Sequence, residues 1–134
     1  MRTAFVFEEG FREAGFGVLK RAERLRKSKD FRITYRSGRA FSGRLLRLYV
    51  LRGGKGRLTG VVASKRTGGA VARNRFRRLV REAVRGMYPL LPDGIRLVFV
   101  AGRGACGASF TDVRAEVCRL LERAGVLSGG GGVD

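Results

Sequence analysis

The sequence of 134 residues contains no histidine and no tryptophan, and it has only two cysteines and two prolines. The absence of histidine excludes a Cys-His zinc site and any catalytic pair that uses imidazole as its base. Cys106 and Cys118 lie in a segment without other ligand types, so they do not complete a metal site. A reduced protein in the cytoplasm is the simplest expectation.

Acidic residues and long apolar runs are also scarce. Only 11 residues are Asp or Glu, and they form no cluster in the sequence that could hold a catalytic metal ion. The pair Ser64 and Lys65 is too common to nominate a nucleophile with its base. The longest apolar runs span a handful of residues, too few to cross a bilayer, and the first residues carry Glu8 and Glu9 where a signal peptide is basic. We therefore expect no membrane segment, no secretion and no active site in the protein itself.

Basic residues, in contrast, are abundant and concentrated in the middle of the chain. The formal net charge is +18, from 29 Lys and Arg residues. Residues 20–85 contain 22 basic and 3 acidic residues, a net charge of +19, so the two ends together are nearly neutral. Such a field attracts polyanions over long distances. The central part predicts a nucleic-acid-binding surface.

The chain is long enough for one domain with one modest core. Residues 18–127 are expected to form this domain, residues 1–17 a loosely ordered extension and residues 128–134 a flexible glycine-rich tail. The apolar periodicity predicts the order helix, strand, strand, helix, strand, helix. These six segments are residues 29–36, 41–52, 58–64, 71–87, 95–101 and 110–124.

Turn and capping residues separate these segments. Ser28 is expected to cap the first helix, and Ser109 with Asp112 resembles a capping box at the start of the last helix. Residues 53–56, Gly-Gly-Lys-Gly, predict a hairpin turn between the first two strands. The almost wholly apolar residues 95–101 predict a buried central strand. The fold class that follows is α+β, a small sheet with helices packed on it.

The long helix separates apolar from basic side chains when successive residues turn by ~100°. Its apolar stripe consists of Ala72, Phe76, Leu79, Val80, Ala83 and Met87. Its opposite side is predicted to carry Asn74, Arg77, Arg78, Arg81 and Arg85, with Arg73 and Arg75 at the edges of the stripe. Arginines four residues apart repel each other by ~0.2–0.5 kcal/mol per pair, and a bound polyanion relieves that repulsion. A solvated charged face is the alternative interpretation.

Two further features are ambiguous. Gly68 and Gly69 precede the long helix and could let a phosphate approach its backbone amides, or they could be a flexible joint. Three aromatic residues, Phe31, Tyr35 and Tyr49, are interspersed with arginines and could stack on unpaired bases at ~1–3 kcal/mol each. Aromatic residues at helical spacing are more often part of a core. The periodicity leaves both interpretations open.

Residues 60–82, with the sequence GVVASKRTGGAVARNRFRRLVRE, closely resemble the signature of the bacterial ribonuclease P protein family. Residues 25–31 and 35–38 are similar to the first helix of this family and to the segment that leads into this helix. The resemblance covers most of residues 20–85, and the order of the later strand and helix agrees. The extension of residues 1–17 and the use of Arg at several positions where the family has Lys depart from the pattern.

The resemblance implies a two-layer α/β sandwich with a left-handed βαβ crossover. It implies a protein subunit of ribonuclease P that assists a catalytic RNA in removing the 5′ leader from precursor tRNA, with Mg²⁺ held mainly by the RNA and no cofactor bound by the protein alone. The residues expected to contact the catalytic RNA are Lys65, Arg66, Arg73, Asn74, Arg75, Arg77, Arg78 and Arg81. Those expected in a cleft for the leader are Phe31, Tyr35, Arg36 and Tyr49.

Two other functions compete with this one. A structural RNA-binding protein of the ribosomal type has a comparable size and charge. A self-sufficient nuclease is disfavoured, because the chain lacks histidine and a carboxylate cluster. The Arg73-Asn74-Arg75 helix and the aromatic cleft favour ribonuclease P over the ribosomal type. The expected partners are the ribonuclease P RNA and the leader of precursor tRNA, and the protein is expected to be a monomer without RNA.

Overall fold

The structure of this protein is a computed structural model that describes residues 24–54 and 56–127. The expectations for residues 1–17 and 128–134 lie outside the described residues. The helices are α2 (Ser28–Ser37), α3 (Ala70–Met87) and α4 (Phe110–Arg123). The strands are β1 (Arg39–Ser42), β2 (Leu46–Arg52), β3 (Arg57–Val62) and β4 (Ile95–Ala101), and short 3-10 turns occur at Lys65–Thr67 (η3), Tyr88–Leu90 (η4) and Ala105–Gly107 (η5).

The four strands form one mixed sheet in the order β1-β2-β4-β3. β2 is antiparallel to both β1 and β4, whereas β3 and β4 are parallel. The parallel pair is joined through α3, which forms a βαβ crossover. The predicted central strand at residues 95–101 is confirmed, because β4 has the same bounds and a strand on each side.

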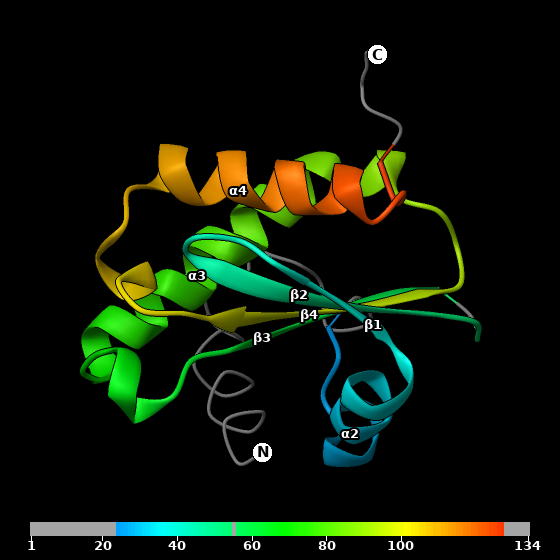
Figure 1. The fold of residues 1–134 in the computed structure, drawn as a ribbon, viewed down its shortest axis with the longest axis horizontal. Coiled ribbons are helices and arrows are strands. Elements are labelled where there is room, and N and C mark those ends of the chain that lie inside the picture. The colour runs from blue at the N-terminus through cyan, green and yellow to red at the C-terminus, as the bar shows by residue number, and fades with distance from the viewer. Residues whose placement is uncertain (1–23, 55, 128–134) are drawn as a thin grey trace.

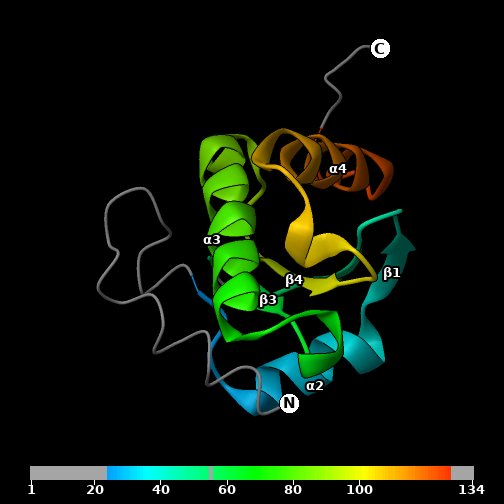
Figure 2. The ribbon, with the colours of Figure 1, turned by 90° about the vertical axis from the view of Figure 1, so that its left-hand side faces the viewer.

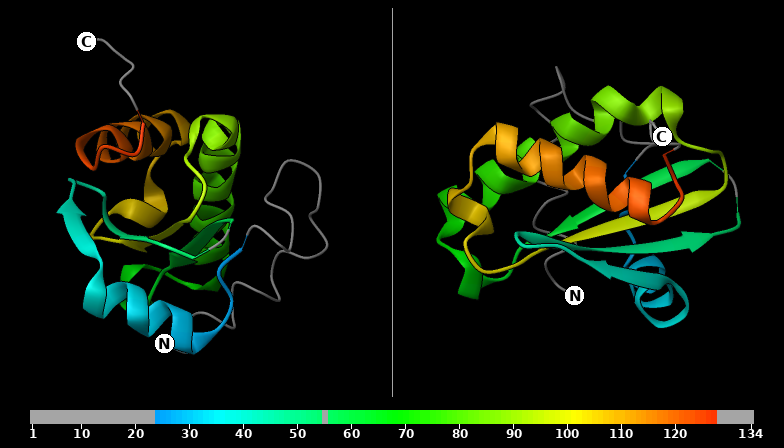
Figure 3. Two further views of the ribbon diagram at one scale, coloured as in Figure 1. Left: turned by 90° about the vertical axis from the view of Figure 1, so that its right-hand side faces the viewer. Right: turned by 45° about the horizontal axis from the view of Figure 1, so that its top comes forward.

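α3 and α4 lie together on one face of the sheet and α2 lies on the other (Figures 1 and 3). The main core fills the space between the sheet and the helices α3 and α4. It includes Leu48, Phe99, Val80 and Val117, each with no exposed area. The other face carries a small cluster of Leu25, Phe31 and Val98. The predicted α+β class with helices packed on a small sheet is therefore confirmed.

The prediction of a single strand at residues 41–52 is wrong. The chain turns at residues 43–45, where the Gly43 amide donates to the Leu46 carbonyl at 2.8 Å, and β1 pairs back onto β2. The two-residue apolar period begins only at Leu46, because β1 is an edge strand whose side chains are mostly exposed. Such a strand has little hydrophobic alternation for a sequence pattern to detect.

The predicted hairpin around residues 53–56 is also wrong. Gly53, Gly54 and Gly56 do turn the chain with positive φ angles of 120°, 80° and 76°. However, β2 and β3 do not pair with each other, because β4 lies between them. β4 is mostly buried and pairs with a strand along each of its edges, so it takes the place beside β2 that β3 would have in a hairpin.

The capping predictions have different outcomes. Ser109 caps α4 as predicted, because its Oγ accepts a hydrogen bond from the Asp112 amide at 3.1 Å. Ser28 is not a cap but the first residue of α2, and Lys27 is the N-cap without a side-chain hydrogen bond. α3 begins one residue before its predicted start and ends at Met87 as expected.

Candidate nucleic-acid interface

The start of α3 carries most of the predicted basic site. Lys65 and Arg66 lie in η3 directly before the helix, and their side chains are exposed. Asn74, Arg75 and Arg78 are also exposed, while Arg73 is half-buried. Figure 2 shows α3 along its length, with the η3 segment and the η5 loop next to its first turns. The structure thus places these six predicted residues in η3 and the first half of α3.

The predicted exposed ridge is wrong for Arg77 and Arg81, whose exposed fractions are 1% and 0%. α3 is rotated relative to the expectation, because Val84 is fully buried while Leu79 is only half-buried. This rotation turns the side of the helix that carries Arg77 and Arg81 inward. Burial, together with the nearby charge of Arg73, lowers the pKa of the Arg77 guanidinium. Contact of these two residues with RNA stays a prediction.

Two residues of the Arg73-Asn74-Arg75 motif also hold the protein together. The Asn74 side-chain oxygen accepts a hydrogen bond from Arg77 Nη1 at 2.9 Å. Arg75 Nη1 donates to the Cys106 carbonyl of η5 at 3.3 Å. Arg75 is therefore placed by the loop after β4, which is close in space although it is 31 residues away in sequence. Gly69, the N-cap of α3, offers no side-chain acceptor to the first amides of the helix.

The predicted aromatic site divides into a core residue and two surface residues. Phe31 is fully buried, and a side chain at Gly60 would place its Cβ 2.6 Å from the Phe31 ring. Gly60 thus makes the room that Phe31 occupies. Phe31 takes the core role that the sequence had left open, whereas Tyr35 and Tyr49 are only half-buried.

Tyr35 and Tyr49 form an edge-to-face pair with ring centroids 4.9 Å apart. Burial, and secondly the neighbouring Tyr49, raises the pKa of Tyr35 to about 12. Arg47 Nη1 donates to the Tyr49 hydroxyl at 3.2 Å, which holds a cation next to that hydroxyl. Arg36 is exposed at the end of α2, as its predicted role requires. The pair lies on the sheet face that α2 only partly covers.

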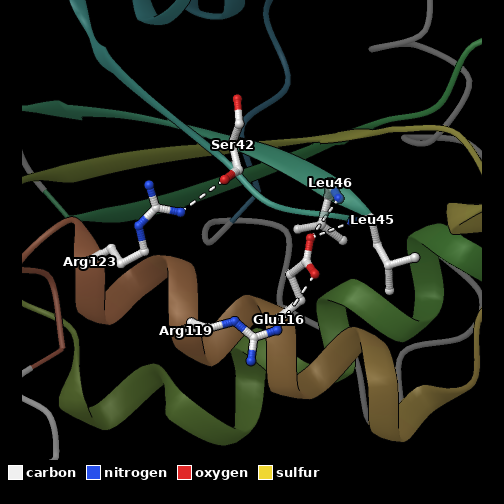
Figure 4. A network of polar contacts seen from close by, with 6 residues as sticks. All are labelled: Ser42, Leu45, Leu46, Glu116, Arg119 and Arg123. Atoms are coloured by element: carbon white, nitrogen blue, oxygen red, sulfur yellow. Dashed lines mark hydrogen bonds and ion pairs between the residues drawn. The ribbon is translucent and has the colours of Figure 1, made fainter.

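One interaction that was not predicted from the sequence connects α4, on the other face of the sheet, to the turn between β1 and β2. The buried Glu116 of α4 accepts hydrogen bonds from the amides of Leu45 and Leu46 at 2.6 and 2.9 Å. These amides belong to the turn between β1 and β2, and Figure 4 shows the carboxylate pointing into that turn. The only signal in the sequence was an acidic residue among the apolar positions of a predicted helix.

The described residues include no group of three or more His, Cys, Asp or Glu side chains that could hold a metal ion. Within the same residues, no helix is both long and apolar enough to cross a membrane. The exposed side chains of the two candidate sites carry guanidinium, ammonium and phenol groups, which bind phosphates and stack on bases. The fold and this surface together define a small basic α+β protein of the RNA-binding class.

Comparison with known proteins identifies the family within this class. The sequence model of the family described as Ribonuclease P matches residues 19–125. The Ribonuclease P protein component of Roseiflexus castenholzii is 42% identical over 114 residues, which are 83% of this chain and 93% of that protein. The Ribonuclease P protein component of Clostridium kluyveri is 37% identical over 106 residues, covering 77% of this chain and 95% of that protein.

Solved structures of RNase P proteins have a fold similar to that of this chain. The RNase P protein of Staphylococcus aureus superimposes with a TM-score of 0.74 at 23% identity and covers 80% of this chain and 99% of its own. The RNase P protein of Thermotoga maritima has a TM-score of 0.68 at 26% identity, covering 75% and 96%. The chain belongs to the ribonuclease P protein family. It serves as the protein subunit of ribonuclease P, and the ribosomal alternative is not favoured.

Proposed function

We propose that the sheet face beside α2 binds the single-stranded 5′ leader of precursor tRNA, while the start of α3 binds the ribonuclease P RNA. The observation that carries the leader site is the half-buried Tyr35–Tyr49 pair on a partly open sheet face. Aromatic rings on a sheet accept unpaired bases, and nearby guanidinium groups neutralise the phosphates between them. Arg36 and Arg47 supply that charge.

The second site consists of the exposed basic side chains around η3 and the first turns of α3. Lys65, Arg66 and Arg78 are exposed and face no acidic partner in any salt bridge between described residues. Planar guanidinium groups can form two hydrogen bonds to one phosphate. Because Gly69 offers no side-chain cap, the first amides of α3 are also suited to a phosphate.

The cleavage chemistry is assigned to the RNA, with Mg²⁺ held mainly by the RNA. The chain contains no histidine, and its described residues contain no cluster of carboxylates. The protein, which we expect to be a monomer without RNA, therefore positions the substrate. Protein purified free of RNA and of contaminating nuclease should leave precursor tRNA intact, and maturation at a normal rate would refute this assignment.

Tyr49→Leu tests the leader site. The substitution should weaken the affinity of the reconstituted holoenzyme for precursor tRNA by roughly five- to a hundredfold, from a stacking energy of ~1–3 kcal/mol. Affinity for mature tRNA and the melting temperature should stay near those of the parent. If Tyr49→Leu binds both tRNAs as the parent does, the leader site is wrong.

Arg78→Ala tests the second site, and Arg114→Ala, an exposed arginine on α4, is its matched control. Removal of one cation from a phosphate should make the slope of log affinity for the ribonuclease P RNA against log salt shallower by about 0.9, the value for a duplex. Arg114→Ala should leave the slope unchanged. Equal slopes for the two variants would show that Arg78 is only solvated.

A further inference from the structure

The short turn η5 packs against η3 and the first turns of α3 (Figure 2). Its central residue, Cys106, is only 5% exposed. The Cys106 thiol donates to Thr67 Oγ1 of η3 at 3.5 Å, and the Cys106 carbonyl accepts a hydrogen bond from Arg75 Nη1 of α3 at 3.3 Å. One residue of η5 is therefore in contact with both parts of the proposed site for the ribonuclease P RNA.

The side chain of Cys106 fits closely against the joint between η3 and α3. A Cβ at Gly68 would lie 3.3 Å from the Cβ atoms of both Cys106 and Ala72, which is closer than most contacts of a Cβ atom. The glycine thus lets η5 approach the joint. Within η3, Thr67 Oγ1 donates to the Ser64 carbonyl at 2.6 Å. The joint that the sequence left open as a flexible one is therefore packed against η5.

The backbone of η5 is closed by hydrogen bonds of its own. The Gly107 amide donates to the Gly104 carbonyl at 3.2 Å, and the Ala108 amide donates to the Ala105 carbonyl at 3.1 Å. Gly104, directly before η5, has a φ angle of 81°, a conformation that residues with a side chain rarely adopt. The turn itself therefore fixes the position of the Cys106 carbonyl.

This carbonyl gives the exposed Arg75 side chain a fixed orientation. An arginine that moves freely in solution loses rotamer freedom when it binds a phosphate, whereas Arg75 has lost part of that freedom in the free protein. A guanidinium has five N–H donors, so one hydrogen bond to Cys106 does not exhaust them. Because the acceptor is a neutral carbonyl, it orients Arg75 without cancelling its positive charge.

We propose that Cys106 is a positioning residue of the site for the ribonuclease P RNA. Its carbonyl orients the Arg75 guanidinium, and the packing of its side chain against η3 keeps that carbonyl in place. The inference rests on the proposed binding of this RNA at the start of α3 and assigns to η5 an indirect role in that binding. A substitution that moves the carbonyl should therefore weaken RNA binding although every cation of the site remains.

The experiment measures the affinity of the full chain for a bacterial ribonuclease P RNA over a range of salt concentrations. Gly104→Ala strains the turn at its positive φ angle, and Gly107→Ala is the matched control, because Gly107 has no positive φ angle. A Cβ at either glycine would meet no atom within 4 Å. Gly104→Ala should weaken binding roughly two- to tenfold, from the entropy of ordering one long side chain, and keep the parent's salt slope. Gly107→Ala should bind as the parent does.

A double-mutant cycle separates positioning from general support of the fold. Arg75→Ala should weaken binding and make the salt slope shallower by about 0.9, because one cation is lost from a phosphate. If the turn acts through Arg75, adding Gly104→Ala to Arg75→Ala should cause no further loss of affinity. A loss by the same factor with and without Arg75 would mean that η5 only supports the fold, and this result would overturn the inference.

A second variant, Cys106→Leu, moves the same carbonyl by a different route, because a larger side chain does not fit against Gly68. It should reproduce the result of Gly104→Ala, and melting temperatures show that each variant is folded in the binding assay. If Arg75→Ala weakens binding while Gly104→Ala and Cys106→Leu bind as the parent does, the positioning role is refuted and the RNA site stands. If Arg75→Ala itself has the parent's affinity and slope, the RNA site fails at Arg75 and the inference fails with it.

Discussion

The two faces of the sheet differ in how completely they are covered. One face is closed by α3 and α4, and its strand residues, such as Leu48 and Phe99, have no exposed area. The other face is covered by α2 only in part, and Tyr49, Val100 and Arg47 remain half-buried or exposed. The same strands supply both faces through alternate residues. Stability thus depends mainly on one face, which leaves the other available for binding.

Phe99→Ala, on the closed face, should have the largest effect on stability. Removal of a fully buried Phe side chain leaves a cavity and should lower the free energy of unfolding by about 3–5 kcal/mol. Urea denaturation measures this decrease. Folded holoenzyme with the variant should still prefer precursor over mature tRNA as the parent does. A selective loss of leader binding would contradict the separation of the two faces.

Glu116→Ala should have the next largest effect, because Glu116 connects α4 on the closed face to the turn beside the open one. Two backbone amides are left without their acceptor, which should cost roughly 1–3 kcal/mol of unfolding free energy. Glu116→Gln keeps a side-chain oxygen that can accept and should restore part of this stability. Glu122→Ala, an exposed carboxylate on the same helix, is the control. Equal stability of Glu116→Ala and the control would mean that the tether is unimportant.

Phe31→Leu compares a buried aromatic ring of the open face with the half-buried ring of Tyr49. Phe31 of α2 is buried against the sheet, so the loss of part of its ring volume should lower the free energy of unfolding by about 1 kcal/mol. Thermal melting of Phe31→Leu and Tyr49→Leu should separate a core ring from a surface ring. A parent-like melting temperature for Phe31→Leu combined with weak leader binding would restore Phe31 as a stacking residue.

Tyr35→Phe should have the smallest effect at neutral pH and a measurable one in alkali. The folded protein raises the pKa of Tyr35 from 10.0 to about 12, so the folded state favours the neutral phenol. The resulting stabilisation is complete below pH 10 and is lost as the pH rises toward about 12. Urea denaturation across this window should show a shallower decline for Tyr35→Phe. Identical declines would contradict the burial of this hydroxyl.

Much of the fold could be predicted from local patterns. The bounds of β4, the extent of α3 and the Ser109 cap follow from short-range features: an apolar run, a helical period and one hydroxyl before a helix. The charge of residues 20–85 and the motif around Arg73-Asn74-Arg75 likewise predicted the class of ligand and the family. These properties depend on neighbouring residues, which a sequence displays directly.

Long-range packing set which side chains are exposed and which loops meet. The rotation of α3 buried Arg77 and Arg81, because the helix packs against α4, η5 and β3 together and the covered side is wider than its apolar stripe. β4 lies between β2 and β3, because a mostly apolar strand is stabilised most by a central position with a strand on each edge. Arg75 meets the Cys106 carbonyl only because η5 packs beside α3. Such contacts join residues far apart in the chain, and no local period encodes them.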